Sequence, residues 1–291
     1  MSKNKEPLVS VIVPTRNSVA TLEDCLQSVA DQTYKNIELI VVDRDSTDDT
    51  KKIAKKFTKK VYNHGPERSA QRNYGVEKAS GIYVAIIDSD MKLSNGVVAS
   101  SVKAMIKSAK NEGVIIPEES FGVGFWAQCK KLERSYYIGN DAIEAARFYK
   151  KSTYQKLGGF NIELVSGEDW DLSRRAREHG EMVRIDDLIY HNEGKINLYK
   201  TLKKKYYYAQ HARNYLVSSE TRSMLFDVSG PLARFRMFFK EPRKLLQKPM
   251  VGIGMLFMKL LEYLAGSVGY LMSKFEGKTS QAHQTKVTQD E

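Results

Sequence analysis

The stretch VSVIVPTRNSVATLEDCLQSVADQTYKNIELIVVD, residues 9–43, decides the fold class. Residues 9–13 form a short β-branched run that stops at Pro14, which predicts a buried strand. Residues 37–42 have the same character, and residues 21–30 between them carry apolar side chains at helical spacing. Strand, helix and strand in this order predict a sheet of parallel strands covered by helices.

The same alternation continues to residue 90. We predict helices at residues 50–57 and 70–79, and strands at residues 61–62 and 82–87, with a further helix at residues 170–179. The fold class is therefore α/β, a mostly parallel, Rossmann-like sheet flanked by helices. Ligands in such folds bind at the carboxyl ends of the strands.

Polar residues gather at those predicted strand ends. Thr15, Arg16 and Asn17 follow the first strand, and residues 43–45 form an acidic turn after the second. Asp88-Ser89-Asp90 follows the fourth strand. If these strands are neighbours, the three groups form one cleft.

Three groups in the sequence suit chemistry, and each has a simpler structural explanation. Asp88 and Asp90 suit Mg²⁺ or Mn²⁺, although the tripeptide also suits a turn or helix cap. Asp169, in Gly-Glu-Asp-Trp-Asp at 167–171, suits a general base, although carboxylates also favour a helix N-terminus. His191 suits a further cation ligand, although a single histidine is more often structural or solvated.

The order of four segments resembles the family 2 glycosyltransferases, which have the GT-A fold, over about residues 8–195. The segments are SVIVPTRN at 10–17, CLQSVADQTYKNIELIVVDRDSTDDT at 25–50, GPERSAQRNYGVEKASGIYVAIIDSD at 65–90 and LGGFNIELVSGEDWDLSRRAREHG at 157–180. The resemblance implies a nucleotide-binding sheet and an inverting, single-displacement transfer of a sugar from a nucleotide-diphosphate sugar. It also implies dependence on Mn²⁺ or Mg²⁺.

The resemblance assigns roles to matching positions. Asp169 matches the catalytic base, with Glu168 or Asp171 in support. The metal would be bound by Asp88, Asp90 and His191. The donor nucleotide would contact Pro14, Thr15, Asn17, Asp43, Arg72, Asp88 and Ser89. One position departs from the family pattern, because Arg44 stands where many members carry a carboxylate that reads uracil, so the donor remains a UDP-, GDP- or dTDP-sugar.

Other functions fit parts of the sequence. A polyprenyl-phosphate glycosyl synthase, similar to dolichol-phosphate mannose synthase, would use a phosphate acceptor and need no base, which the Glu168-Asp169 pair disfavours. An inactive nucleotide-sugar-binding or scaffold protein would not need Asp90 and Asp169. Nucleic-acid binding has no recognisable module behind it.

The positive charge is local. Of a formal net charge of +11, residues 200–250 supply a surplus of nine, with twelve Lys or Arg against three Asp or Glu. An anionic partner such as membrane headgroups or a lipid phosphate is expected nearby. Residues 250–272 follow and are strongly apolar, with Lys259, Glu262, Gly266, Tyr270 and Ser273 on one narrow helical stripe.

These features predict a catalytic domain at residues 1–199, a helical membrane-docking region at 200–276 and a disordered tail at 277–291. The apolar helix would lie in the membrane interface, span the bilayer, or pack against protein. The two cysteines, a polar N-terminus without a signal peptide and the basic region together predict a cytoplasmic protein, peripheral on the inner face of the cell membrane, with a lipid-linked acceptor.

Overall fold

A computed structural model describes residues 6–141, 143–164, 167–211 and 231–287. The chain divides into two compact units. The sheet unit contains Met1–Phe121, Tyr137–Ile162 and Gly167–Glu193. The helical unit contains Gly122–Tyr136, Glu163–Ser166 and Gly194–Glu291, so a segment from inside the predicted catalytic domain groups with the C-terminal region.

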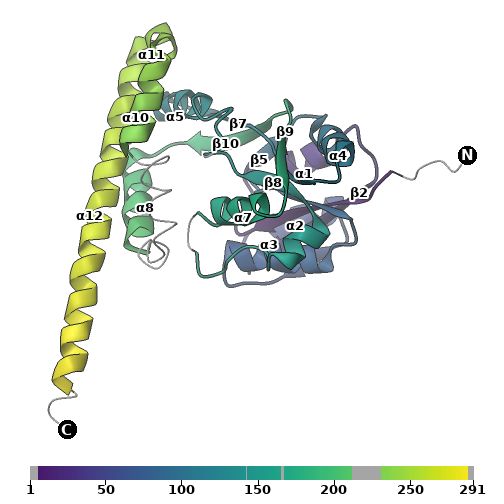
Figure 1. Ribbon diagram of the computed structural model, residues 1–291, viewed down its shortest axis with the longest axis horizontal. Coiled ribbons are helices and arrows are strands. Elements are labelled where there is room, and N and C mark those ends of the chain that lie inside the picture. The colour runs from purple at the N-terminus through teal and green to yellow at the C-terminus, as the bar shows by residue number, and fades with distance from the viewer. Residues whose placement is uncertain (1–5, 142, 165–166, 212–230, 288–291) are drawn as a thin grey trace, which may run out of the picture. The chain divides into compact units, whose positions relative to one another are not determined.

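The sheet unit is built on a seven-stranded sheet with the strand order β3-β2-β1-β4-β8-β6-β9. Three of its strands, β2, β8 and β9, are labelled in Figure 1. The strands are β1 Val9–Thr15, β2 Ile37–Asp43, β3 Val61–Asn63, β4 Tyr83–Ile86, β6 Asn111–Ile115, β8 Ala146–Lys150 and β9 Glu181–Arg184. β1 pairs in parallel with both β2 and β4, whereas β8 is antiparallel to its neighbours β4 and β6. The predicted mostly parallel sheet is confirmed.

Helices cover both faces of this sheet. One face packs on α1 Leu22–Ala30, α2 Thr50–Phe57 and α4 Val97–Lys107, and the other on α3 Arg68–Lys78, α6 Lys151–Lys156 and α7 Glu168–Arg177. The alternation within β1 explains the two layers, because Val11 and Ile12 point to opposite faces. Gly75 lets α3 approach closely, since a Cβ there would lie 2.4 Å from Ile12 Cγ2.

A second, three-stranded sheet has the order β5-β10-β7, with β5 Met91–Leu93, β10 Ile189–Lys195 and β7 Glu118–Val123. β10 pairs antiparallel with β5, and His191 lies opposite Met91 in that register. The backbone N–H of Asn192 donates to Asp90 O at 2.8 Å. This pairing brings His191, from far along the chain, beside the acidic turn that follows β4.

The helical unit contains α5 Phe125–Ser135, α8 Leu198–His211, α10 Pro231–Lys240, α11 Pro242–Gln247 and the long α12 Pro249–Val287. The predicted helical C-terminal appendage is confirmed. α12 continues to Val287, so part of the segment predicted as a disordered tail is helical here, and residues 288–291 lie outside the described residues. Within α12, Pro249–Ser273 has the length and composition to cross a membrane, with a mean hydropathy of 1.4.

Candidate active site

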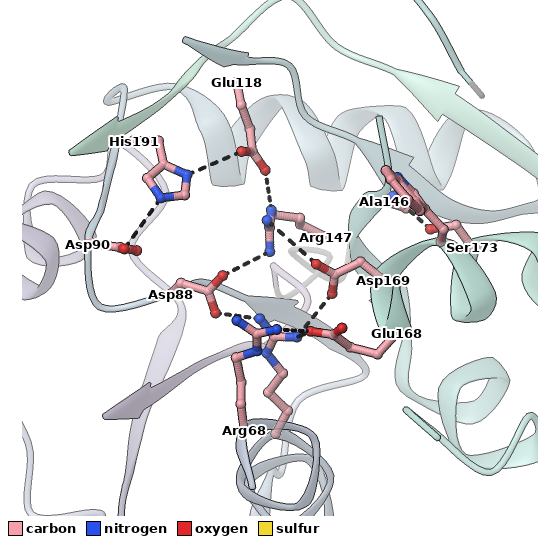
Figure 2. Close-up of polar contacts among 12 residues, drawn as sticks. Arg68, Asp88, Asp90, Glu118, Ala146, Arg147, Glu168, Asp169, Ser173 and His191 are labelled. Atoms are coloured by element: carbon pink, nitrogen blue, oxygen red, sulfur yellow. Dashed lines mark hydrogen bonds and ion pairs between the residues drawn. The ribbon is translucent and has the colours of Figure 1, made fainter. Parts of the chain in front are cut away.

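Polar side chains gather at the carboxyl ends of β1, β2 and β4, which are neighbours in the sheet. The predicted cleft requires these three strands to be neighbours, and their order in the sheet meets that requirement. Asp88 and Asp90 lie just beyond β4, and α7 and β8 bring charged residues of distant sequence to the same edge (Figure 2). The edge becomes an ionic network rather than a row of independent carboxylates.

Arg72 is the centre of this network. It projects from α3, is fully buried, and donates to Asp88 Oδ1 at 2.5 Å and to Asp169 Oδ1 at 3.0 Å. It also donates to Glu168 Oε1 at 3.1 Å. A buried guanidinium requires paired carboxylates. Arg72 therefore fixes three acidic side chains from two elements in one arrangement.

Arg147 is the second buried cation, and it lies between the carboxylates. Its Nε donates to Glu118 Oε1 at 2.5 Å, and its Nη atoms lie 3.5 Å from Asp88 Oδ2 and 3.8 Å from Asp169 Oδ2 (Figure 2). Burial alone would raise the pKa of Asp88, but Arg72 and Arg147 outweigh it and hold that pKa well below its ordinary value. Asp88 is therefore a carboxylate at neutral pH.

Asp169 lies at the start of α7, after Gly167, which adopts a left-handed φ of 83°. Arg72 binds one of its oxygens and Arg147 approaches the other, yet a quarter of its side chain stays exposed. Its neighbour Glu168 is nearly buried and pairs with Arg68 Nη2 at 2.6 Å. Burial, followed by the charge of Asp169, raises the pKa of Glu168. Asp169 is thus the carboxylate of this pair that a ligand can reach.

Asp90 and His191 form the arrangement that best suits a cation. His191 Nε2 lies 3.3 Å from Asp90 Oδ2, and its Nδ1 lies 3.5 Å from Glu118 Oε2. In the described part of the chain, no three His, Cys, Asp or Glu side chains form a cage. Mg²⁺ commonly takes one or two protein ligands and completes its shell with substrate phosphates and water. An oxygen and a nitrogen side by side, with a carboxylate behind the imidazole, therefore fit Mn²⁺ or Mg²⁺ bound together with a diphosphate.

Asp88, the third predicted metal ligand, has a different set of partners. Both of its oxygens face guanidinium groups, from Arg72 and Arg147. Its backbone oxygen accepts from the Cys25 thiol at 3.5 Å. For these reasons the proposed cation site rests on Asp90 and His191.

Five predicted nucleotide contacts, Pro14, Thr15, Asn17, Asp43 and Ser89, lie at or just beyond the carboxyl ends of β1, β2 and β4, and hydrogen bonds tie the loops after β1 and β2 together. Asp43 is fully buried and accepts from Thr15 Oγ1 at 2.9 Å and from the Ser46 N–H at 2.9 Å. Asn17 adopts a left-handed φ of 49°, and its side-chain oxygen accepts from the Thr47 N–H at 2.9 Å. Pro14 is a buried β1 residue, and Ser89 Oγ donates to Ser18 Oγ at 2.9 Å. Asp43 thus orders the loops after β1 and β2 from beneath.

Two other residues from the sequence analysis lie apart from this network. Arg44 donates to Pro66 O and pairs with Glu67 Oε1 at 3.3 Å, so it ties the loop after β2 to the start of α3. Asp171 binds Arg175 at 2.6 Å, and Arg175 donates to Gly159 O at 2.8 Å. Asp171 therefore anchors α7 to the loop that precedes it.

Sequence reasoning missed Arg68, Glu118 and Arg147. Arg147 had one visible signal, because it is a lone cation among the apolar and aromatic residues of Ala-Arg-Phe-Tyr at 146–149. A charged residue inside a strand of that kind requires a buried partner. Glu118 and Arg68 had no such signal, since each lies just after a proline and beside other polar residues, as turn residues commonly do.

Comparisons with known proteins identify the family and the fold of the chain. The family described as Glycosyl transferase family 2 matches residues 10–161. The chain is 27% identical over 257 residues to the GalNAc(5)-diNAcBac-PP-undecaprenol beta-1,3-glucosyltransferase of Campylobacter jejuni, covering 84% of this chain and 75% of that protein. It is 28% identical over 189 residues to a PGL/p-HBAD biosynthesis glycosyltransferase of Mycobacterium bovis, covering 61% and 72%.

Two solved structures share the fold. The mannosyltransferase PcManGT from Pyrobaculum calidifontis, in complex with GDP-Man and Mn²⁺, has a TM-score of 0.61 and 17% identity, covering 92% of this chain and 88% of that chain. TarS residues 1–349 from S. aureus, in complex with UDP-GlcNAc, has a TM-score of 0.50 and 18% identity, covering 94% and 92%. At these identities the likeness establishes the fold.

Proposed function

Because the chain belongs to glycosyl transferase family 2, we propose that it transfers a hexose from a nucleoside-diphosphate sugar to a hydroxyl group of a lipid-linked acceptor, with inversion at the anomeric carbon, at the cytoplasmic face of the cell membrane. The chain is a nucleotide-sugar-dependent glycosyltransferase. The name of the Campylobacter jejuni relative specifies a polyprenol-linked acceptor, which supports the lipid-linked part. The observation that carries the proposal is the partly exposed Asp169, held at the same sheet edge as the Asp90–His191 pair.

Asp169 would take the proton from the acceptor hydroxyl as that oxygen attacks the sugar. Arg72 and Arg147 hold its carboxylate in one orientation, which favours a defined attack geometry. Attack from the side opposite the leaving diphosphate inverts the anomeric carbon. Arg72 and Arg147 are positioning residues in this account, because each acts on the acceptor through Asp169.

Asp90 and His191 would hold Mn²⁺ or Mg²⁺, with Glu118 orienting the imidazole. When bound, the cation supplies neutralisation of the negative charge that develops on the leaving diphosphate. The loops after β1 and β2, ordered by buried Asp43, would contact the nucleotide through Thr15 and Asn17.

A donor screen tests this function. Purified full-length protein is incubated with UDP-, GDP- and dTDP-sugars and either Mn²⁺ or Mg²⁺, and release of nucleoside diphosphate is measured. We expect release from one nucleotide class, faster when a lipid-linked acceptor is added. Absence of release from every donor, with cation and acceptor present, would contradict the proposal.

A phosphate acceptor is the second candidate, and the arginines favour it. Arg68, Arg72 and Arg147 bring three guanidinium groups to the site, and Arg68 is partly exposed. Guanidinium groups bind phosphate well. The product separates the two cases, because mild acid releases the transferred sugar as a free monosaccharide from a sugar phosphodiester, whereas a glycosidic bond keeps that sugar attached to the acceptor hydroxyl. We expect the transferred sugar to stay attached to the acceptor.

A further inference from the structure

In residues 249–273 of α12, the pattern of buried and exposed side chains is the reverse of that in a surface helix of a water-soluble protein. The two charged side chains of this segment are buried in the helical unit, whereas most of its large apolar side chains are exposed. The inward face consists of Gly252, Gly254, Met255, Met258, Lys259, Glu262, Gly269 and Ser273, all buried. Lys259 and Glu262 are only 3% and 4% exposed. A surface helix normally buries its apolar stripe instead.

The buried charges are paired within the helical unit. Lys259 Nζ lies 2.5 Å from Glu133 Oε1 of α5 and 2.7 Å from Glu262 Oε2. Burial alone would lower the pKa of Lys259, but Glu133 and Glu262 outweigh it, so that pKa lies above its ordinary value. Lys130 also pairs with Glu133 at 2.9 Å. These pairs clamp one face of α12 against α5.

α8 packs along the same face of α12. A Cβ at Gly269 would lie 2.4 Å from Tyr206 O, and a Cβ at Gly254 would lie 2.4 Å from Phe125 Cζ of α5. Glycine at these positions lets the neighbouring helices approach closely. The inward face is therefore covered by α5 and α8, which fixes the opposite face as the outward one.

The outward face is a continuous apolar stripe. Met250 is 72% exposed and Phe257 is 51% exposed, and the spacing of three or four residues is kept over about 30 Å of helix. From residue 249 to residue 273 no exposed side chain of α12 is charged. The outward stripe consists of Met250, Ile253, Phe257, Leu260, Leu264, Val268 and Leu271. A stripe of this size marks an interaction surface.

Charge identifies the partner of the outward stripe. The exposed charged side chains on the described parts of α5, α8, α10, α11 and α12 are all Lys or Arg, among them Lys203, Lys204, Arg236 and Lys240. Between α10 and α11, Glu241 is exposed but pairs with Lys244 at 2.9 Å. Apolar side chains bordered by cations fit the acyl chains and phosphates of an anionic bilayer.

A second copy of the chain fits the outward stripe less well. Helices that pair through a stripe of this spacing normally carry charges beside it, which set the register. Here the charged residues of α12 between 249 and 273 are Lys259 and Glu262, and both are buried on the inward face. Pairing would also bring two strongly basic regions together, which is unfavourable.

We propose that α12 docks this enzyme on an anionic membrane, lying in the plane of the interface with the outward stripe inserted among the acyl chains. An in-plane orientation follows from α8, because a spanning α12 would carry the exposed Lys203, Lys204 and Lys205 into the bilayer core. The proposal deepens the proposed function, since it brings the enzyme to the surface where a lipid-linked acceptor lies.

Flotation of the full-length protein with vesicles is the first test. The vesicles are phosphatidylcholine alone, or phosphatidylcholine and phosphatidylglycerol in equal parts, and no donor is present. We expect flotation with both, stronger with the anionic vesicles, and high salt should weaken it without abolishing it. Failure of the protein to float with either kind of vesicle would overturn the proposal.

A triple variant, Ile253→Gln, Phe257→Gln and Leu264→Gln, tests the outward stripe itself. Each side chain is at least half exposed, so the change spares the packed face. We expect partitioning into anionic vesicles to fall by about a hundredfold. The matched control is Ile82→Gln with Ile106→Gln, two equally exposed apolar residues of the sheet unit, which should float like the wild type. Equal flotation of the triple variant would refute the role of the outward stripe.

Nitroxide labels separate in-plane docking from spanning. Cys25 and Cys129 are buried, so a thiol reagent labels single cysteines introduced as Met250→Cys, Phe257→Cys, Leu264→Cys or Leu271→Cys. We expect electron paramagnetic resonance to place all four labels at the same shallow depth in the bilayer. Depth that changes steadily along the helix would indicate a spanning helix and overturn the in-plane orientation.

Two outcomes separate this proposal from the proposed function. A protein that turns over donor but does not float refutes docking and leaves the transferase function intact. A protein that floats but does not turn over donor refutes the transferase function and leaves docking intact. A wild-type dimer that the triple variant converts to a monomer, without flotation of either, would assign the outward stripe to a second copy and refute docking.

Discussion

Buried charged side chains lie in different surroundings in the sheet unit and in α12. In the sheet unit, apolar side chains such as Val11 fill the interior, and Arg72 is buried at an edge where Asp88 and Asp169 remain partly exposed. In α12, Lys259 and Glu262 are buried against protein while apolar side chains face outward. Charge at an open edge suits a polar ligand, whereas charge turned inward behind an apolar surface suits a lipid environment.

Removing the Asp90 carboxylate is the change that should have the largest effect on the sheet unit. Asp90→Ala removes the oxygen ligand of the proposed cation beside His191. We expect donor turnover to be abolished, and excess EDTA to do the same reversibly to the wild type. Asp31→Ala, an exposed carboxylate at the C-terminal end of α1, is the control and should stay active. Full activity of the wild type in EDTA would refute the cation site.

Breaking the charge pairs of α12 should destabilise the helical unit. Lys259→Met leaves Glu133 and Glu262 buried with one cation fewer, so we expect a loss of about 3 kcal/mol in the free energy of unfolding, measured by urea denaturation. Lys56→Met, which removes an exposed pair with Glu23, should cost less than about 1 kcal/mol. Equal small losses would show that the inward charges contribute little to stability.

A smaller effect is expected at the other end of β2 from the site. Burial would raise the pKa of Glu38, but hydrogen bonds from Lys60 and Ser10 outweigh it and lower that pKa from 4.5 to about 2. A lowered folded-state pKa means that this stabilisation is complete above about pH 4.5 and is lost as the pH falls toward 2. Glu38→Gln should flatten the pH dependence of stability in that window, with a change on the order of 1–2 kcal/mol. An unchanged pH profile would contradict the assignment.

Periodicity predicted the first ninety residues of the sheet unit well, because each strand and helix there is a short segment with its own apolar pattern. The predicted strands at residues 9–13 and 37–42 correspond to β1 and β2, and the predicted helix at 50–57 matches α2. Their ends bring Thr15, Asp43 and Asp88 to one edge, as a parallel sheet requires.

The rest of the site depends on contacts between distant segments, which periodicity does not encode. Arg147 reaches Asp169 only because β8 inserts between β4 and β6. The sequence indicated that Lys259 and Glu262 lie on one stripe of the helix, but it did not indicate whether that stripe faces other helices or faces outward. Glu133 of α5 determines that direction, and α5 lies inside the predicted catalytic domain.

The variant Asp169→Asn tests the catalytic account most directly, because it keeps the size of the side chain and one accepting oxygen and removes its negative charge and basicity. Turnover with donor, cation and lipid-linked acceptor is measured beside donor binding, and Glu178→Gln at the other end of α7 serves as the control. We predict a fall in turnover of about 10²–10⁴-fold with donor binding retained. Normal turnover of Asp169→Asn would contradict the account.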